Sequence, residues 1–155
     1  MRTRRVDVNT QGLFSSATDE WSTPQDLFDE LNAVFHFDLD ACATPANAKC
    51  RRYFTKADDA LKQTWTGTVW MNPPYGRQIE AFMKKACESF RDGATVVCLV
   101  PARTDTRWWH QYAAKGHVLF LRGRLKFEGG PHSAPFPSAV VIFWNGRLRD
   151  SHSTR

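Results

Sequence analysis

The hydrophobic positions of the chain follow two periods, one typical of strands and one typical of helices. Short apolar runs rich in β-branched residues predict five strands, which span residues 37–43, 68–71, 94–100, 118–121 and 139–144. The run from Ala94 to Val100 is continuous, which indicates a strand that is buried on both faces. The chain is therefore expected to contain a sheet with a fully buried strand.

Segments whose apolar residues have helical spacing lie before or between several of these strands. Thr23 and Pro24 are expected as the N-cap and the first residue of an amphipathic helix. Its apolar positions are Leu27, Leu31, Val34 and Phe35. Further helices are predicted over residues 78–90 and 106–114. Alternating strands and helices predict a mostly parallel α/β sheet, and the last two strands, which only a loop joins, predict an antiparallel pair at its C-terminal edge.

The two ends of the chain carry no periodic pattern. We interpret residues 1–18 as a flexible basic arm, residues 19–145 as a single domain and residues 146–155 as a disordered tail. A chain of 155 residues suits one domain with a modest core. No apolar run approaches the roughly 20 residues of a membrane-spanning helix, and no apolar segment follows the basic start as it does in a secretory signal.

Charge and cysteine content narrow the class of protein only slightly. The net charge of +5 suits a polyanionic partner such as nucleic acid. The four cysteines form no CxxC pair and have no histidine at zinc-ligand spacing, so no metal site is predicted. We expect reduced thiols in a cytoplasmic protein, with Cys98 as a small core residue.

Two polar residues stand at the carboxyl ends of predicted strands. Asp40 lies where the first apolar run ends, and Asn72 directly follows the strand over residues 68–71. Because the carboxyl ends of parallel strands meet at one edge of a sheet, where ligands bind in α/β proteins, we expect both residues on one rim.

The loop Asn72-Pro73-Pro74-Tyr75 suits the methylation of an amino group that is conjugated to a ring. The N6 amine of adenine is a poor nucleophile because its lone pair is delocalised, and an acceptor for each N–H would draw that lone pair out of conjugation. The Asn72 side-chain oxygen and the Pro73 carbonyl are the candidate acceptors, since two prolines remove competing N–H donors and stiffen the loop. Tyr75 would offer a flat face to an adenine flipped out of the duplex. The alternative is that the four residues form only a rigid turn.

The loop matches the [DNS]PP[YFW] motif of amino-group methyltransferases, and the chain resembles the phage-type DNA N-6-adenine methyltransferase (Dam) family over residues 19–144. The shared blocks follow the same order, at residues 20–24, 39–50, 69–75, 101–106, 122–127 and 134–139. The resemblance implies a minimal Rossmann-like class I methyltransferase sheet. Methyltransferases of this kind often carry a separate recognition domain, for which this chain is expected to have no room. The resemblance also implies S-adenosyl-L-methionine as methyl donor, adenine N6 in double-stranded DNA as acceptor, action in the host cytoplasm if phage-encoded, and a role in host-mimicking or anti-restriction modification.

The same resemblance suggests residues for the cofactor. Asp40, with Ala41 beside it, is expected to bind the methionine amino group, unless it only caps a turn; the glycine-rich loop usual at this point is absent. Asp58 or Asp59 is expected at the ribose or adenine, unless both lie in a solvated turn. The segment Trp21-Ser22-Thr23-Pro24 is expected to close over the methionine end, with a plain helix cap as the alternative.

Basic residues of predicted loops and helix starts are the expected phosphate contacts. They are Arg103, Arg107, Arg122, Arg124 and Lys126. The pair Trp108-Trp109 is interpreted as core packing, with a wedge into DNA as the alternative. No segment is left for a separate recognition domain, so these residues would have to contact DNA from the methyltransferase domain itself.

Other functions fit part of the pattern. An amide or RNA methyltransferase would use the same loop, because a glutamine amide has the same conjugated nitrogen. A non-catalytic basic DNA-binding module would lack cofactor binding. Cytosine-C5 methylation is disfavoured because no proline is followed by cysteine, and cytosine-N4 enzymes more often open the loop with serine.

Overall fold

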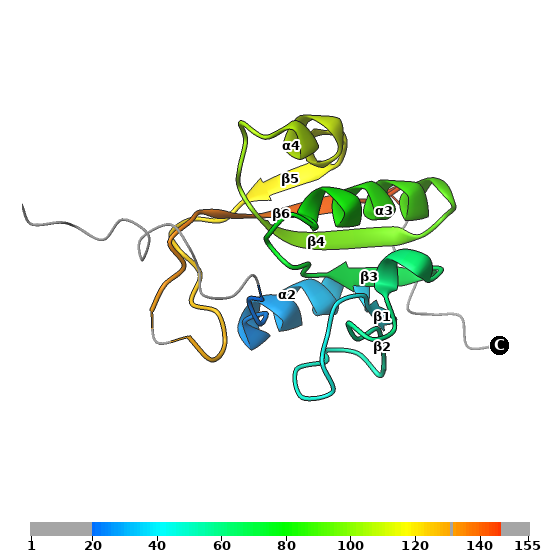
Figure 1. The fold of residues 1–155 in the computed structure, drawn as a ribbon, viewed down its shortest axis with the longest axis horizontal. Helices are drawn as coiled ribbons and strands as arrows, with labels where there is room; N and C mark the ends of the chain where they lie inside the picture. Colours follow the sequence, from blue (N-terminus) through cyan, green and yellow to red (C-terminus); the bar gives the residue numbers. More distant parts are fainter. Residues whose placement is uncertain (1–19, 131, 147–155) are drawn as a thin grey trace, which may run out of the picture.

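A six-stranded sheet forms the centre of the protein (Figure 1), in a computed structural model that describes residues 20–130 and 132–146. Its strands lie in the order β2-β1-β3-β4-β6-β5. They are β1 (Leu39–Asp40), β2 (Arg52–Tyr53), β3 (Thr68–Met71), β4 (Thr95–Pro101), β5 (His117–Phe120) and β6 (Ser138–Phe143). The predicted basic arm, and the predicted tail except for Gly146, lie outside the described residues.

The sheet is mostly parallel, as predicted. β2, β1, β3 and β4 run in one direction, whereas β6 is antiparallel both to β4 and to β5. The antiparallel pair predicted at the C-terminal edge is thereby confirmed. β1 has β2 on one side and β3 on the other, so the strand order reverses between β1 and β3. Open α/β sheets bind their ligands beyond the carboxyl ends of the strands at such a reversal.

The strands beside this reversal are shorter than the sequence pattern suggests. Within the run predicted over residues 37–43, only Leu39–Asp40 is a strand. The pattern does not predict β2 at all, because Arg52–Tyr53 is neither apolar nor long enough to alternate. β2 exists through its pairing with β1, which the Phe54 N–H extends by donating to the Asp40 carbonyl at 3.0 Å.

The helices confirm the pattern in outline. They are α2 (Gln25–Phe35), α3 (Ile79–Arg91) and α4 (Arg107–Gln111), with short 3₁₀ turns η1 (Ala60–Lys62) and η2 (Ala113–Lys115). The helix predicted over residues 106–114 is therefore divided into α4 and η2. The Thr106 hydroxyl caps α4 by accepting from the Trp109 N–H at 3.4 Å. Trp108 and Trp109 are both buried, so they are packing residues and not a wedge into DNA.

The predicted start of the first helix is wrong. Pro24 is the N-cap and not the first helical residue, and the Thr23 side chain makes no capping bond. The Thr23 hydroxyl instead accepts hydrogen bonds from two residues of β3 and the loop after it, because tertiary partners compete with the local cap. The buried face also differs from the prediction, since Phe28 is enclosed whereas Val34 is 50% exposed.

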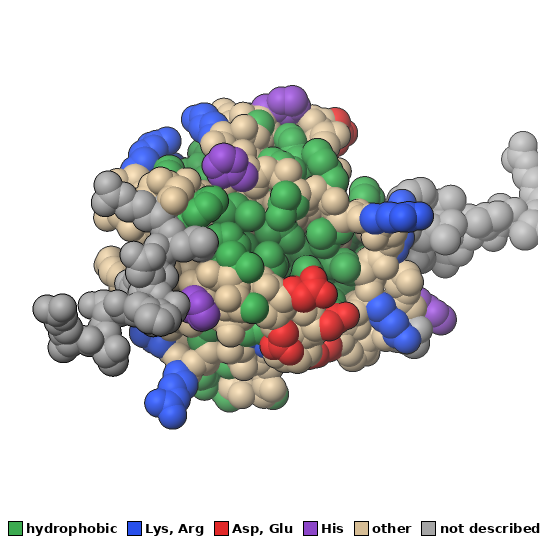
Figure 2. Space-filling view, turned by 180° about the vertical axis from the view of Figure 1, so that it is seen from behind, with side chains coloured by type: hydrophobic (Ala, Val, Ile, Leu, Met, Phe, Trp, Pro, Cys, Tyr) green, Lys and Arg blue, Asp and Glu red, His purple; other side chains and the backbone are tan. Residues whose placement is uncertain are grey.

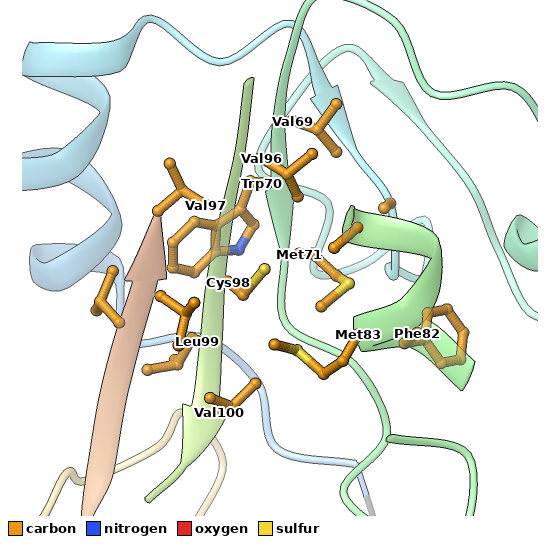
Figure 3. Packing of buried hydrophobic residues seen from close by; sticks show 14 of the residues in the cluster. Val69, Trp70, Met71, Phe82, Met83, Val96, Val97, Cys98, Leu99 and Val100 are labelled. Atoms are coloured by element: carbon orange, nitrogen blue, oxygen red, sulfur yellow. The ribbon is translucent and has the colours of Figure 1, made fainter. Parts of the chain in front are cut away.

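The core lies on both faces of β3 and β4. Successive strand residues point to opposite faces, and Trp70 packs edge-on against Phe28 of α2 with ring centroids 5.6 Å apart. Met71 therefore faces the other layer, where Met83 of α3 lies beside it (Figure 3). Cys98 is fully buried between the layers, as predicted for a small core residue. The sheet is thus held between α2 on one side and α3 with α4 on the other.

The side of the molecule turned away in Figure 1 carries a group of hydrophobic side chains with acidic side chains beside them (Figure 2). α2 contributes the exposed carboxylates Asp26, Asp29 and Glu30. Over the described ranges, every helix is too short or too polar to cross a membrane.

Candidate active site

A cavity of about 1120 Å³ lies at the carboxyl ends of β1 and β3, where the strand order reverses. Asp40 and Asn72 both line it, which confirms that the two strand ends converge. The other lining residues come from segments 20–23, 41–47, 54–61 and 73–82. Pockets for one small molecule occupy roughly 300–1,000 Å³, so this cavity is slightly larger than that range.

Asn72 is the first residue after β3, and the extended segment 20–24 holds its side-chain amide. Its Nδ2 donates to the backbone carbonyl of Trp21 and to the hydroxyl of Thr23, the latter at 3.0 Å. A carbonyl oxygen can only accept, so the nitrogen of the amide and not its oxygen must face Trp21. The hydrogen-bond partners therefore define which way the amide points.

The oxygen of the same amide lacks a partner. Oδ1 of Asn72 is buried, and none of the residues in the described part of the chain donates a hydrogen bond to it. An unpaired buried acceptor costs about 1–3 kcal/mol, so its retention calls for an explanation. The partner that suits it is an N–H group of a ligand. Because the oxygen is shielded from bulk water here, such a ligand reaches it only when neighbouring groups move aside.

The segment that holds Asn72 is itself fixed from its other side. The Glu128 N–H donates to the Ser22 carbonyl at 3.1 Å, and the two residues form an antiparallel bridge. Asn47 Nδ2 donates to the Ser22 hydroxyl at 3.3 Å. The indole of Trp21 packs edge-on against two phenylalanine rings, each with its centroid 5.2 Å away. The acceptors that orient Asn72 therefore lie on a well-supported backbone.

Some residues of the loop after Asn72 line the cavity, and another is buried in the core. Pro73 and Pro74 line the cavity. Tyr75 does not: it is 3% exposed, its hydroxyl donates to the Leu99 carbonyl at 3.1 Å, and burial raises the pKa of that hydroxyl well above its usual range. The expectation that Tyr75 offers an open stacking face is therefore wrong for this conformation, because the ring is enclosed in the core with its hydroxyl satisfied.

Asp40 has the turn-capping role that the sequence left open, and it also lies at the cavity where a cofactor contact is expected. Its carboxylate anchors the following loop, since Oδ1 accepts from the Cys42 N–H at 3.3 Å and Oδ2 from the Lys49 N–H at 3.0 Å. It also borders the cavity while being only 3% exposed. Burial raises the pKa of Asp40 to about 6, against the opposing effect of these hydrogen bonds and of the Lys49 charge. A cationic ligand group beside it would favour the ionised form.

Asp58 and Asp59 differ in their position relative to the cavity. Asp58 accepts from the backbone N–H and the hydroxyl of Thr55, at 2.8 and 2.9 Å, which lowers its pKa, and it does not line the cavity. It therefore forms the solvated turn. Asp59 does line the cavity, with a half-exposed side chain 3.7 Å from Lys62. Of the two carboxylates, Asp59 is the candidate for a cofactor contact.

The remaining predicted cofactor residues are also placed. Trp21, Ser22, Thr23 and Ala41 line the cavity, whereas Pro24 does not. Pro24 is the buried N-cap of α2 and does not form part of the cavity wall.

The sequence of this chain is similar to those of known proteins. A family model described as DNA N-6-adenine-methyltransferase (Dam) matches residues 11–149. The chain belongs to this family. A DNA N-6-adenine-methyltransferase of Escherichia phage T1 is 35% identical over 131 residues, which cover 72% of this chain and 55% of that protein. A protein of the same name from Haemophilus phage HP1 is 32% identical over 117 residues, which cover 72% and 68%. The chain thus spans about half the length of the phage T1 relative.

In this Dam family chain, the basic residues expected at DNA differ in how they are bound. Arg103 Nη1 donates to the Tyr75 carbonyl at 3.4 Å, which ties it to the loop after Asn72. Arg107 forms a two-point ion pair with Glu80, at 2.9 and 3.0 Å, so a phosphate would compete with that carboxylate. The other three are exposed on the segment between β5 and β6: Arg122, Arg124 and Lys126.

Sequence reasoning misses two residues, Lys49, which links segments around the cavity, and Arg77, which lines it. The Lys49 side chain is 6% exposed, and its Nζ donates to Gln25 at 2.6 Å and to Glu128 at 3.3 Å. It therefore links the loop after β1, the start of α2 and the segment before β6. No local pattern marks it, because its partners lie 24 and 79 residues away. Arg77 lines the cavity. Its position two residues after Tyr75 is the signal that could have identified it from the sequence.

Proposed function

We propose that this chain is an S-adenosyl-L-methionine-dependent methyltransferase that acts on the N6 amine of adenine in double-stranded DNA. The observation that carries the proposal is the Asn72 amide, whose nitrogen is held by Trp21 and Thr23 while its oxygen lacks a partner. An acceptor that is oriented before the substrate arrives needs no reorganisation during the reaction. Membership of the Dam family agrees with this chemistry.

The proposed reaction uses two acceptors at the end of β3. Asn72 Oδ1 accepts one N6–H of the base and the Pro73 carbonyl accepts the other, which directs the lone pair of the nitrogen out of the ring plane. S-adenosyl-L-methionine supplies an electrophilic methyl group when bound. The lone pair of N6 would form the new bond to the methyl carbon as the bond from that carbon to the donor sulfur breaks, which would leave S-adenosyl-L-homocysteine. The resulting ammonium is acidic enough to release its proton to water without a dedicated base.

The cavity is lined by carboxylates and apolar side chains, which suit the groups of S-adenosyl-L-methionine. The Asp40 carboxylate, which burial disfavours as an anion, would gain from the cationic amino group of the methionine moiety. Asp59 is proposed to bind the ribose hydroxyls, and Trp21, Ser22 and Ala41 to enclose the methionine end. Apolar side chains such as Phe54 also line the cavity and offer contacts for an adenine ring.

Adenine reaches such a cavity only after it leaves the duplex. Flipping a base costs a few kcal/mol of lost stacking and pairing, which backbone contacts have to offset. We propose Arg103, Arg122, Arg124 and Lys126 as these contacts, with Arg107 less available because Glu80 already binds it. Arg103 contacts the proposed catalytic loop directly, because it donates a hydrogen bond to the carbonyl of Tyr75.

We further propose that the sheet is a reduced Rossmann-like class I methyltransferase sheet. Its parallel strands, the reversal of strand order between β1 and β3, and the cavity at that reversal support this assignment. The antiparallel β6 between β4 and β5 is the departure from a fully parallel arrangement.

Transfer of a labelled methyl group to alternative substrates tests the proposal. The purified chain would be incubated with S-adenosyl-L-methionine and, separately, with duplex DNA, RNA of the same sequence or a glutamine-containing peptide. We expect label in the duplex DNA. Label in RNA or peptide alone would replace the proposal with the RNA or amide alternative. DNA binding without detectable cofactor binding would identify a non-catalytic module.

A further inference from the structure

Thr23 contacts two residues at the end of β3 through its hydroxyl. The hydroxyl oxygen accepts the indole N–H of Trp70 at 3.3 Å and the amide N–H of Asn72 at 3.0 Å. Thr23 is 5% exposed and Trp70 is fully buried, so neither N–H has water as a ready substitute. A hydroxyl oxygen has two lone pairs, and both are directed to donors here. These two hydrogen bonds hold the Thr23 side chain in place, and they also orient the side chains of Trp70 and Asn72.

We infer that Thr23 is a positioning residue for Asn72 in the reaction proposed above. The Asn72 amide has two supports, the Trp21 carbonyl and the Thr23 hydroxyl. The first belongs to the backbone, so the second is the support that a side-chain substitution can remove. With this support lost, only the Trp21 carbonyl restrains rotation of the amide about its bond to Cβ, so Oδ1 is held less closely in the direction in which it would meet the base.

The position of Thr23 is well defined for such a role. The residue before it is pinned by the Ser22–Glu128 bridge, and the residue after it is the N-cap of α2. Trp70, the second donor to Thr23, packs edge-on against Phe28 of the same helix. The hydroxyl is therefore held by the sheet and the helix together, and its position does not depend on Asn72.

This role differs from a direct contact with the cofactor, which the sequence suggested for Thr23. A hydroxyl that already accepts from two donors keeps only its hydrogen for a ligand. A cofactor contact would therefore appear as a change in cofactor affinity. A positioning role would appear as a slower methyl transfer at unchanged cofactor affinity, because the misplaced acceptor matters only in the transition state. Small misplacements of this kind cost on the order of a hundredfold in rate.

The first test follows the Asn72 side-chain amide in the free protein by NMR, with its signals assigned by their loss in Asn72→Ala. Exchange of these amide hydrogens with water, measured by saturation transfer, should be about tenfold faster in Thr23→Val, which keeps the shape but lacks the hydroxyl. Thr23→Ser should stay near the wild-type rate. Thr68→Val makes the same change in a buried residue at the start of β3 and should have no effect. Equal exchange in Thr23→Val and the wild-type protein would overturn the inference.

The second test measures methyl transfer and cofactor binding on the same variants. We expect a ten- to hundredfold lower kcat in Thr23→Val, an unchanged Kd for S-adenosyl-L-methionine, and recovery in Thr23→Ser. A weaker Kd with an unchanged kcat would make Thr23 a cofactor ligand and overturn the inference. If Thr23→Val does not fold, Thr23→Ala, which admits water to both N–H groups, repeats both measurements. If the wild-type protein transfers no methyl group to DNA, the proposed function fails, whereas the NMR result still decides whether Thr23 holds the amide.

Discussion

The ends of β1 and β3 border the same cavity, yet the protein binds their polar residues in opposite ways. At β3, the Asn72 amide is held through its nitrogen and its oxygen has no partner among the described residues. At β1, both oxygens of Asp40 accept N–H groups of the following loop. The first arrangement leaves a buried acceptor that a ligand could use once neighbouring groups move aside. The second maintains the shape of the cavity and offers the ligand mainly a nearby charge.

This difference separates two kinds of mutational effect. Removing a group whose active atom is unpaired should change the reaction and leave the fold intact. Removing a group that the fold already uses should change stability as well as binding. Substitutions at the two strand ends can therefore confirm or break the comparison.

The largest effect is expected for Asn72→Ala. It removes an acceptor whose contribution arises in the transition state, and loss of one such group typically lowers kcat by about 10²–10³. The free energy of unfolding should change less than in Asp40→Ala, because loss of the two hydrogen bonds of the Asn72 nitrogen is partly offset by removal of an unpaired buried oxygen. Single-turnover methyl transfer and thermal unfolding of the same sample measure both quantities. Turnover at the wild-type rate would end the catalytic assignment of Asn72.

Asp40→Ala should reduce cofactor affinity by roughly ten- to a hundredfold, as expected when a charge-assisted hydrogen bond of about 1.5–3 kcal/mol is lost. The sequence alone predicts a larger effect on cofactor affinity than on the fold. The bonds to the N–H groups of Cys42 and Lys49 change that prediction, because each group left unpaired destabilises the protein by about 1–3 kcal/mol. Calorimetry and denaturant unfolding measure the two losses. Unchanged binding of S-adenosyl-L-methionine would exclude Asp40 from the site.

The raised pKa of Asp40 predicts opposite pH trends for binding and for stability. Below a pKa of about 6 the carboxyl group is protonated, so affinity for the cationic cofactor should fall by up to about tenfold per pH unit. The folded state binds this proton more tightly than the unfolded state does. The contribution of Asp40 to stability therefore increases as the pH falls from about 6 towards 4.

Calorimetry at several pH values, with Asp40→Asn as the control that cannot titrate at this position, tests the binding trend. Cofactor affinity with the same pH dependence in both proteins would show that another group titrates.

Smaller effects are expected on the DNA side. Arg103→Ala, Arg122→Ala and Arg124→Ala should each weaken DNA binding and reduce the slope of log K against log salt concentration by about 0.9. Arg107→Ala should change the slope less, because Glu80 already binds that guanidinium. Arg52→Ala, at the far edge strand β2, is the control. A slope that none of the first three changes alters would place the DNA contacts elsewhere, with the N-terminal arm as the next region to delete.

The sequence predicts those features whose signals are local. The apolar run of β4 and the motif that begins at Asn72 need no distant partner to be recognised. The same reasoning fails where tertiary contacts override local preference. Thr23 before Pro24 has the pattern of a helix cap, yet its hydroxyl bonds a residue 49 positions away. Tyr75 belongs to the motif, yet its hydroxyl finds a partner in the core and its ring is buried.

The chemical identity of the product tests the central claim most directly. Plasmid DNA would be incubated with S-adenosyl-L-methionine and either the wild-type chain or Asn72→Ala, digested to nucleosides and analysed by mass spectrometry. We predict N6-methyladenine from the wild-type chain and none above background from the variant. N4-methylcytosine as the sole product, or equal amounts of N6-methyladenine from both proteins, would contradict the claim.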